Sequence, residues 1–177
     1  SVSEELSMNS IICTSPSKTF NLAALQIANI IIPNPVIREQ YMTEVLTTRA
    51  KPKCNVLAYV ACRQAYEYGE EWLRQLRELL YKNEMIIRDF FETEFPQLTV
   101  TEHQGTYLLW IDFRALNMED RALEKMLREE ADLFFSEGYR YGESGCGYVR
   151  WNIACPTGCI EAALKRLQTV LRARGRL

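Results

Sequence analysis

The sequence predicts a mixed α/β fold in two parts, residues 1–69 and residues 70–177. The first part combines short apolar runs, which predict strands, with stretches of helical periodicity. An amphipathic stretch then begins at Glu70 and predicts a helix of about 25 residues, longer than the ~11–12 residue average. A helix of that length can connect two domains, so the boundary is placed at Gly69. Beyond it, strands and helices succeed one another as in an α+β domain.

In the first part, turn-forming residues separate the predicted elements. The predicted strands are 10–13 and 27–32, and the predicted helices are 36–48 and 56–68. The first strand is expected to be buried and to run into a turn at Pro16. Asn55 is expected to cap the helix that follows it. The apolar stripe of that helix consists of Leu57, Val60, Ala61 and Ala65.

In the second part, the long helix carries a continuous apolar stripe until Pro96. The further predicted elements are strands 98–101, 106–113, 133–135 and 148–154, and helices 118–130 and 158–174. Alternation along the strand 148–154 places Val149, Trp151 and Ile153 on one face. Arg150 and Asn152 lie on the opposite face.

Composition indicates a soluble globular protein, with 47% hydrophobic and 25% charged residues. A net charge of −2 gives no reason to expect nucleic acid or an anionic membrane as a partner. No apolar run approaches the ~18 residues of a membrane span. Six scattered cysteines without a CxxC pair indicate reduced thiols in a cytoplasmic protein. The single histidine, His103, argues against a zinc site and is expected to be solvated.

One candidate for chemistry is Lys18, in the segment Thr14–Ala23 with sequence TSPSKTFNLA. A lysine at the end of a buried strand is open to desolvation, which lowers the pKa of an amine and makes it nucleophilic. The alternative is an ordinary lysine in a polar turn between two strands.

The wider segment SPSKTFNLAALQIANIIIPN resembles the cofactor-lysine segment of the fold-type I pyridoxal-phosphate enzymes. Within aminotransferase class I/II it is most similar to the C–S lyase branch, of cystathionine β-lyase or MalY/PatB type. The resemblance implies that Lys18 forms the Schiff base with pyridoxal 5'-phosphate. It also implies that Ser15, and less strongly Ser17, bind the cofactor phosphate.

Two positions depart from that pattern. Ala24 stands where relatives usually carry glycine. Gln26 stands where aminotransferases proper carry a phosphate-binding arginine, which the lyase branch commonly lacks.

The second candidate is Arg150, in the segment GYVRWNIACP. A strand arginine can hold a carboxylate through two parallel hydrogen bonds; the alternative is an arginine that faces solvent or pairs with a nearby acid. The segment resembles the family's F/Y-V-R-x-N strand, whose arginine binds the substrate α-carboxylate. GTYLLWIDFR, residues 105–114, is similar to the family's small-domain strand.

The resemblance implies a C-terminal portion of a longer fold-type I enzyme. Residues 1–69 would complete the cofactor-binding large domain, and residues 70–177 would form the small domain. The implied activity is a C–S β-lyase that acts on cystathionine or a cysteine conjugate, a small sulfur-containing amino acid, within a homodimer. A class I/II aminotransferase, and a non-catalytic fragment or binding module that folds without cofactor, remain the alternatives.

Overall fold

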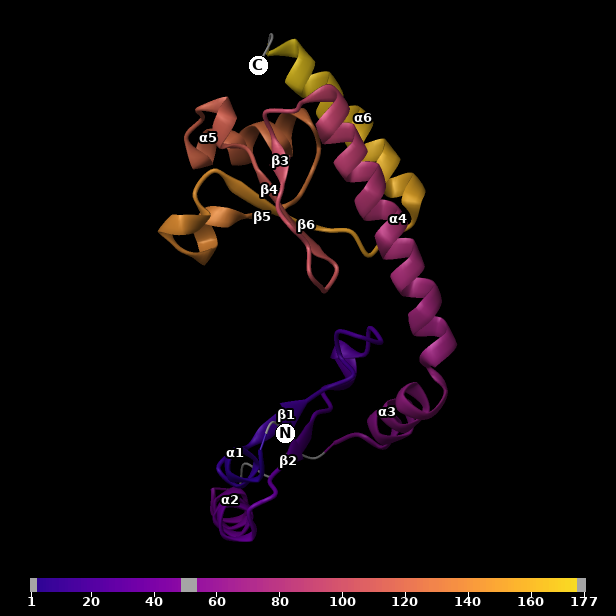
Figure 1. Cartoon of the computed structure of the whole chain (residues 1–177), viewed down its shortest axis with the longest axis vertical. Coiled ribbons are helices and arrows are strands. Elements are labelled where there is room, and N and C mark those ends of the chain that lie inside the picture. Colours follow the sequence, from indigo (N-terminus) through magenta and orange to yellow (C-terminus); the bar gives the residue numbers. More distant parts are fainter. Residues whose placement is uncertain (1–2, 49–53, 175–177) are drawn as a thin grey trace. The chain divides into compact units, whose positions relative to one another are not determined.

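The protein is described by a computed structural model that covers residues 3–48 and 54–174. The chain separates into two compact units, residues 1–74 and 75–177, and each is described by itself (Figure 1). This division falls within the first turns of the long helix, whereas the sequence places the boundary at Gly69, where that helix begins.

The first unit contains short strands and three helices among its described residues. Its elements are α1 (Glu4–Met8), β1 (Ile12–Thr14), a 3₁₀ turn (Ala23–Leu25), β2 (Asn29–Ile31), α2 (Pro35–Thr47) and α3 (Val56–Tyr68). Strands β1 and β2 pair antiparallel, with Cys13 opposite Ile30. The connection between them carries Lys18, four residues after the end of β1.

The helix starts follow the predicted capping chemistry. The Asn55 side-chain oxygen accepts a hydrogen bond from the Leu57 amide at 2.7 Å, which satisfies an otherwise unpaired donor of α3. The Asn34 side chain accepts in the same way from the Val36 amide at 2.9 Å, and Pro35 occupies the first turn of α2. The cap predicted at Asn55 is therefore confirmed.

Burial in the first unit differs from the prediction. Strand β1 is exposed along its whole length, so the expected buried strand before the lysine turn is wrong. In α3 the buried residues are Ala58 and Cys62, whereas Leu57 and Val60 are 69% and 54% exposed. The helix approaches Ile27 through small side chains, which allow closer contact than the larger residues of the predicted stripe.

The second unit packs helices against an antiparallel sheet. Its elements are the greater part of α4 (Glu70–Glu94), then β3 (Thr99–Val100), β4 (Leu108–Asp112), α5 (Asp120–Lys125), β5 (Ser136–Glu137), β6 (Tyr148–Asn152) and α6 (Thr157–Ala173). Short turns lie between them: 3₁₀ turns at Arg114–Leu116, Gly138–Tyr141 and Glu143–Gly145, and a π-helical turn at Met126–Glu130 that prolongs α5. The short strand predicted at 133–135 lies instead at Ser136–Glu137, because the Leu133 amide donates to the Leu127 carbonyl at 2.8 Å and so closes the preceding helical turn.

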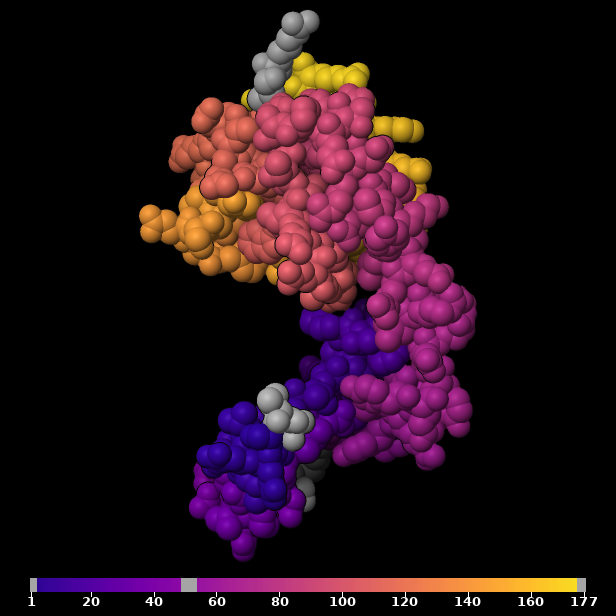
Figure 2. All heavy atoms as spheres, viewed as in Figure 1, coloured from indigo at the N-terminus to yellow at the C-terminus, as the bar shows by residue number. Residues whose placement is uncertain are grey.

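The sheet has the order β3-β4-β6-β5, and one of its faces is covered (Figure 1). Leu109, Ile111, Val149 and Trp151 point from its two central strands into a core shared with α4, α5 and α6. The predicted alternation along β6 is confirmed, since Val149 and Trp151 are buried, Asn152 is exposed and Arg150 is intermediate. In the space-filling view, the atoms of this unit that face the viewer form a closely packed surface (Figure 2).

A buried amide joins α4 to the segment between β6 and α6. Asn83 is fully buried, and its side-chain nitrogen donates to the carbonyl oxygens of Ile153 at 3.0 Å and Cys155 at 2.9 Å. Its side-chain oxygen accepts from the Thr157 hydroxyl at 2.9 Å. One side chain therefore satisfies three groups of the segment that leaves the sheet.

Replacement of Asn83 with alanine is expected to destabilise the second unit by about 2–4 kcal/mol, because it leaves buried carbonyl groups without donors. The measurement is the free energy of unfolding in urea. Lys82→Ala, at the exposed neighbouring position of α4, is the control and should change this free energy by less than about 0.5 kcal/mol. Equal effects of the two substitutions would contradict the role given to Asn83.

Candidate functional site

Lys18 lies at the centre of a hydrogen-bonded turn between β1 and β2. The Phe20 amide donates to the Pro16 carbonyl at 2.9 Å, and the Leu22 amide donates to the Ser17 carbonyl at 3.1 Å. The turn continues into residues with left-handed backbone, Asn21 with φ 54° and Gln26 with φ 52°. These bonds close the chain around Lys18 and present its side chain outward.

The two serines beside the lysine form a small hydrogen-bond cluster. The Ser15 hydroxyl donates to the Ile27 carbonyl at 2.8 Å and accepts from the Ser17 amide at 3.1 Å. The two hydroxyl oxygens lie 2.6 Å apart. Since Ser15 gives its only hydrogen to Ile27, the Ser17 hydroxyl is the donor between them. Ser15 thus ties the start of the lysine turn to the chain that enters β2.

The side chain of Lys18 is exposed, and no hydrogen bond or ion pair to it is present within residues 3–48 and 54–174. The described residues therefore do not give Lys18 the desolvated environment expected from a buried strand. The sequence prediction was wrong on this point because strands β1 and β2 form an isolated two-stranded sheet with exposed residues. The amine remains free to react or to bind an anion.

Phe20 anchors the lysine turn to the helices that follow. Its ring meets the Tyr66 ring edge-on, with centroids 5.9 Å apart, and lies 5.8 Å from the Trp72 ring. A side chain at Gly69 would overlap the Phe20 ring, so glycine is required where α3 meets α4. Phe20 is a residue that sequence reasoning did not assign; its signal was an apolar ring two residues after the lysine in a polar turn.

Arg150 lies on β6, on the face of the sheet opposite the core. Its Nη2 donates to the Ser136 hydroxyl at 3.2 Å, and its guanidinium carbon lies 4.8 Å from the centre of the Tyr141 ring. Its Nε is buried and has no hydrogen-bond partner within the described chain. No described carboxylate pairs with it, so the alternative of an internal ion pair does not apply to this arginine.

The neighbouring Arg114, in contrast, is paired with a carboxylate. Arg114 donates from Nη2 to the Asp112 carboxylate at 2.7 Å and lies over the Tyr148 ring at 4.8 Å. Hydrogen bonds from Arg114 hold the pKa of Asp112 below its usual range. Both arginines stack on a tyrosine ring. Arg114 also binds a carboxylate, whereas Arg150 has no carboxylate partner among the described residues.

His103 is not solvated, and this corrects the sequence prediction. Its Nδ1 lies 2.7 Å from a Glu84 carboxylate oxygen, and both side chains are mostly buried. Arg88 donates to the other Glu84 oxygen at 2.8 Å and to the carbonyls of Val100 and Thr101. The turn after β3 folds back on α4. The polar sequence around His103 does not indicate this contact, because the partner lies 19 positions away in the chain.

The pKa of Glu84 is lowered by these contacts. Burial opposes ionisation of the carboxyl group, but hydrogen bonds from His103 and Arg88 outweigh burial. A carboxyl group with a lowered folded-state pKa stabilises the fold above its unfolded pKa of about 4.3, and this contribution disappears as the pH falls through the folded-state pKa.

Glu84→Gln is accordingly expected to lower the free energy of unfolding by about 1–3 kcal/mol at pH 7, where the charged hydrogen bonds are lost. The difference from wild type should shrink as the pH falls well below about 4. Urea unfolding at pH 7 and at a pH well below about 4 measures this difference in the free energy of unfolding. Glu92→Gln, at an exposed position of α4, is the control. A pH-independent difference would contradict the ionised pairing.

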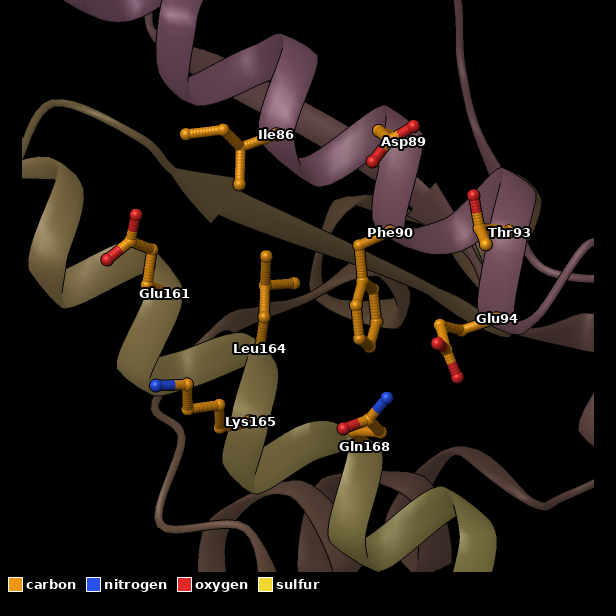
Figure 3. A pocket seen from close by; sticks show the side chains of 9 residues that line it. All are labelled: Ile86, Asp89, Phe90, Thr93, Glu94, Glu161, Leu164, Lys165 and Gln168. Atoms are coloured by element: carbon orange, nitrogen blue, oxygen red, sulfur yellow. The ribbon is translucent and has the colours of Figure 1, made fainter.

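A groove between α4 and α6 is separate from the predicted site residues (Figure 3). Its volume is about 290 Å³, with Ile86, Phe90 and Leu164 between the helices and the carboxylates of Asp89 and Glu161 at its edges. Its one lysine, Lys165, is exposed, and neither Lys18 nor Arg150 lines the groove.

No cluster of three or more potential metal ligands is present in residues 3–48 and 54–174. Among the helices in the same ranges, none combines the length and apolarity that a bilayer crossing requires.

Comparison with known proteins decides the family. Residues 2–167 match the aminotransferase class I and II family. The chain belongs to this family. Protein MalY of Escherichia coli (strain K12) is 39% identical over 160 residues, which are 90% of this chain and 41% of MalY. Cystathionine beta-lyase PatB of Bacillus subtilis (strain 168) is 31% identical over 171 residues, 97% of this chain and 44% of PatB.

Among solved structures, cystalysin from Treponema denticola, which contains a pyridoxal 5'-phosphate cofactor, is similar with a TM-score of 0.90 and 39% identity. The match covers 98% of this chain and 44% of cystalysin. The expected family and the mixed helix–sheet fold class are confirmed. The chain spans less than half the length of these aminotransferase class I and II relatives.

Proposed function

We propose that this chain supplies the lysine and the carboxylate-binding arginine of a pyridoxal-phosphate-dependent C–S β-lyase. The observation that carries the proposal is Lys18, an exposed amine without an internal partner in a turn closed by hydrogen bonds. Its support is the similarity to MalY, PatB and cystalysin. In this proposal residues 1–69 complete the large domain and residues 70–177 form the small domain.

The donor set of the lysine turn fits the cofactor. A primary amine at Lys18 can bond to an aldehyde carbon. The hydroxyls of Ser15 and Ser17, three residues and one residue before it, can turn toward a phosphate once one of their mutual hydrogen bonds opens. When bound, pyridoxal phosphate supplies the electron sink for the reaction at Cα. One lysine and two serines are a small part of a ligand set, so the 177-residue chain alone is expected to bind it weakly.

In the proposed reaction, Arg150 and Lys18 have separate roles. Arg150 holds the α-carboxylate of an amino acid through its free N–H groups, which orients the substrate. The amine of Lys18 takes the proton from Cα and later returns a proton, as a general base and acid. If the β-substituent is a thiolate it leaves as the thiol after protonation, and water hydrolyses the remaining three-carbon enamine, through its imine, to pyruvate and ammonia.

The proposed substrate class is cystathionine or another cysteine conjugate, and the proposed setting is a cytoplasmic homodimer. A second candidate, an aminotransferase, is favoured by the family to which the chain belongs. Both reactions would use Lys18 and Arg150 in the same roles. They differ in where the proton returns and in whether a keto acid is consumed.

The deciding experiment uses the enzyme that contains this chain together with the rest of the fold. Release of pyruvate from cystathionine without an added keto acid supports the lyase, and strict dependence on a keto acid would overturn it. Borohydride reduction with pyridoxal phosphate, followed by peptide mass mapping, should place a single pyridoxyl adduct on Lys18. Scattered labelling, or none, in that enzyme would contradict the role of Lys18.

A further inference from the structure

Three segments of the second unit meet at Arg150. In the register of the sheet, Arg150 on β6 lies opposite Trp110 on β4 and opposite Ser136 on β5. Tyr141 arrives from the 3₁₀ turn that follows β5. The guanidinium therefore has one neighbour from each adjacent strand and one from the loop.

Two of these neighbours contact the guanidinium itself. The Ser136 hydroxyl accepts from Nη2 at 3.2 Å, and the Tyr141 ring lies 4.8 Å from the guanidinium carbon, within the range of cation–π attraction. The Tyr141 ring is held in turn by the Trp110 ring, which meets it edge-on with centroids 5.3 Å apart. The position of the guanidinium is thus fixed by contacts that leave its charge uncompensated.

The nearest acid on β5 is turned away and already occupied. Glu137 follows Ser136, so its side chain points to the opposite face of the sheet, where it is buried. It accepts from Arg128 at 2.5 Å and pairs with Arg140 at 2.7 Å. Two arginines share Glu137, while Arg150 keeps Nη1 without a partner and a buried Nε without a partner in the described chain.

We propose that Tyr141 and Ser136 are positioning residues that hold the Arg150 guanidinium ready for a carboxylate ligand; the inference rests on the proposed role of Arg150. The ring and the hydroxyl restrict the guanidinium to one orientation before a ligand arrives. Nη1 and the second hydrogen of Nη2 then form the fork that receives the two carboxylate oxygens. Restricting a flexible arginine in advance lowers the entropy lost on binding.

The test measures acetate binding at Arg150 in this chain by NMR of its side-chain Nε–Hε signal, assigned with Arg150→Gln. Acetate is titrated against sodium chloride at equal ionic strength. Tyr141→Leu removes the ring, and Tyr141→Phe keeps it. Tyr148→Leu is the matched control, because Tyr148 lies under Arg114, which is already paired with Asp112.

The expected result is that Tyr141→Leu weakens acetate binding roughly three- to tenfold, the size of one cation–π contact, and speeds exchange of the Nε hydrogen with water. Tyr141→Phe and Tyr148→Leu should retain wild-type affinity. If Tyr141→Leu does not fold, Ser136→Ala takes its place, with an expected weakening of about two- to fivefold from one hydrogen bond.

Two other outcomes are distinguishable. Wild-type affinity in both Tyr141→Leu and Ser136→Ala overturns the positioning role and leaves the proposed function of Arg150 intact. Failure of acetate to shift the Arg150 signal in the wild-type chain overturns the carboxylate-binding role itself, and the positioning role with it.

Discussion

In the proposed C–S β-lyase, Lys18→Ala is expected to lower cystathionine cleavage roughly 10³-fold or more. In the proposed mechanism the substitution removes both the nucleophilic amine and the group that moves the Cα proton, and loss of a general acid–base group alone changes rates by about 10²–10⁴-fold. The measurement is pyruvate release under saturating substrate, together with the loss of the borohydride-reduced adduct. The fold should be unaffected, because Lys18 is exposed and has no described partner.

Lys165→Ala is the matched control, since Lys165 is an exposed lysine on α6 far along the chain from the lysine turn. It should retain wild-type activity and the single adduct. If Lys18→Ala retained more than a tenth of wild-type activity, another base would have to be sought, and the assignment of Lys18 would be wrong.

Gly138→Ala is expected to destabilise the second unit by about 3 kcal/mol, the upper end of the effects of overpacking. A side chain at this position would overlap the Gly145 carbonyl oxygen and would lie 2.6 Å from the Tyr148 carbonyl oxygen. Both obstacles are backbone atoms, so no side-chain rotation relieves the clash. The two turns that place Tyr141 would have to separate, which should also weaken carboxylate binding at Arg150.

Gly158→Ala tests whether this effect is specific. A side chain at Gly158, near the start of α6, meets nothing within 4 Å. That variant should be neutral or stabilised by up to about 1 kcal/mol, as expected for alanine in a helix. Urea unfolding compares the two, and equal stability of Gly138→Ala and wild type would contradict the close approach of the two turns.

Local signals in the sequence predicted most of the elements. The 25-residue helix α4 was predicted because its apolar stripe is continuous and its neighbours, Gly69 and Pro96, are strong breaks. Alternation predicted the two faces of β6, because a strand turns successive side chains to opposite sides. These features depend on spacing along the chain, which a single sequence contains.

Burial and long-range pairing were predicted less well. The exposure of β1 and of the larger apolar residues of α3 depends on what packs against them, which periodicity alone does not specify. The contact of His103 with Glu84 joins residues 19 positions apart, and the buried Asn83 serves carbonyls about 70 positions away. An asparagine on the apolar stripe of a long helix was the available signal for the second of these.

The candidate residues themselves came from short motifs, and their surroundings came from the structure. Ser15, Ser17 and Lys18 are neighbours in the sequence, so the turn brings them together by necessity. Ser136 and Tyr141 reach Arg150 only through the pairing of β5 with β6 and the turn after it. That register could not be predicted because the strand was expected at residues 133–135.

Through Phe20, the lysine turn packs against the junction between α3 and α4. Its ring contacts Tyr66 before Gly69 and Trp72 after it, and it fills the space where a side chain at Gly69 would stand. A substitution at Gly69 would therefore displace this ring, and the ring is two residues from Lys18. The ring contacts on either side of Gly69 are thus also contacts of the segment that carries the candidate amine.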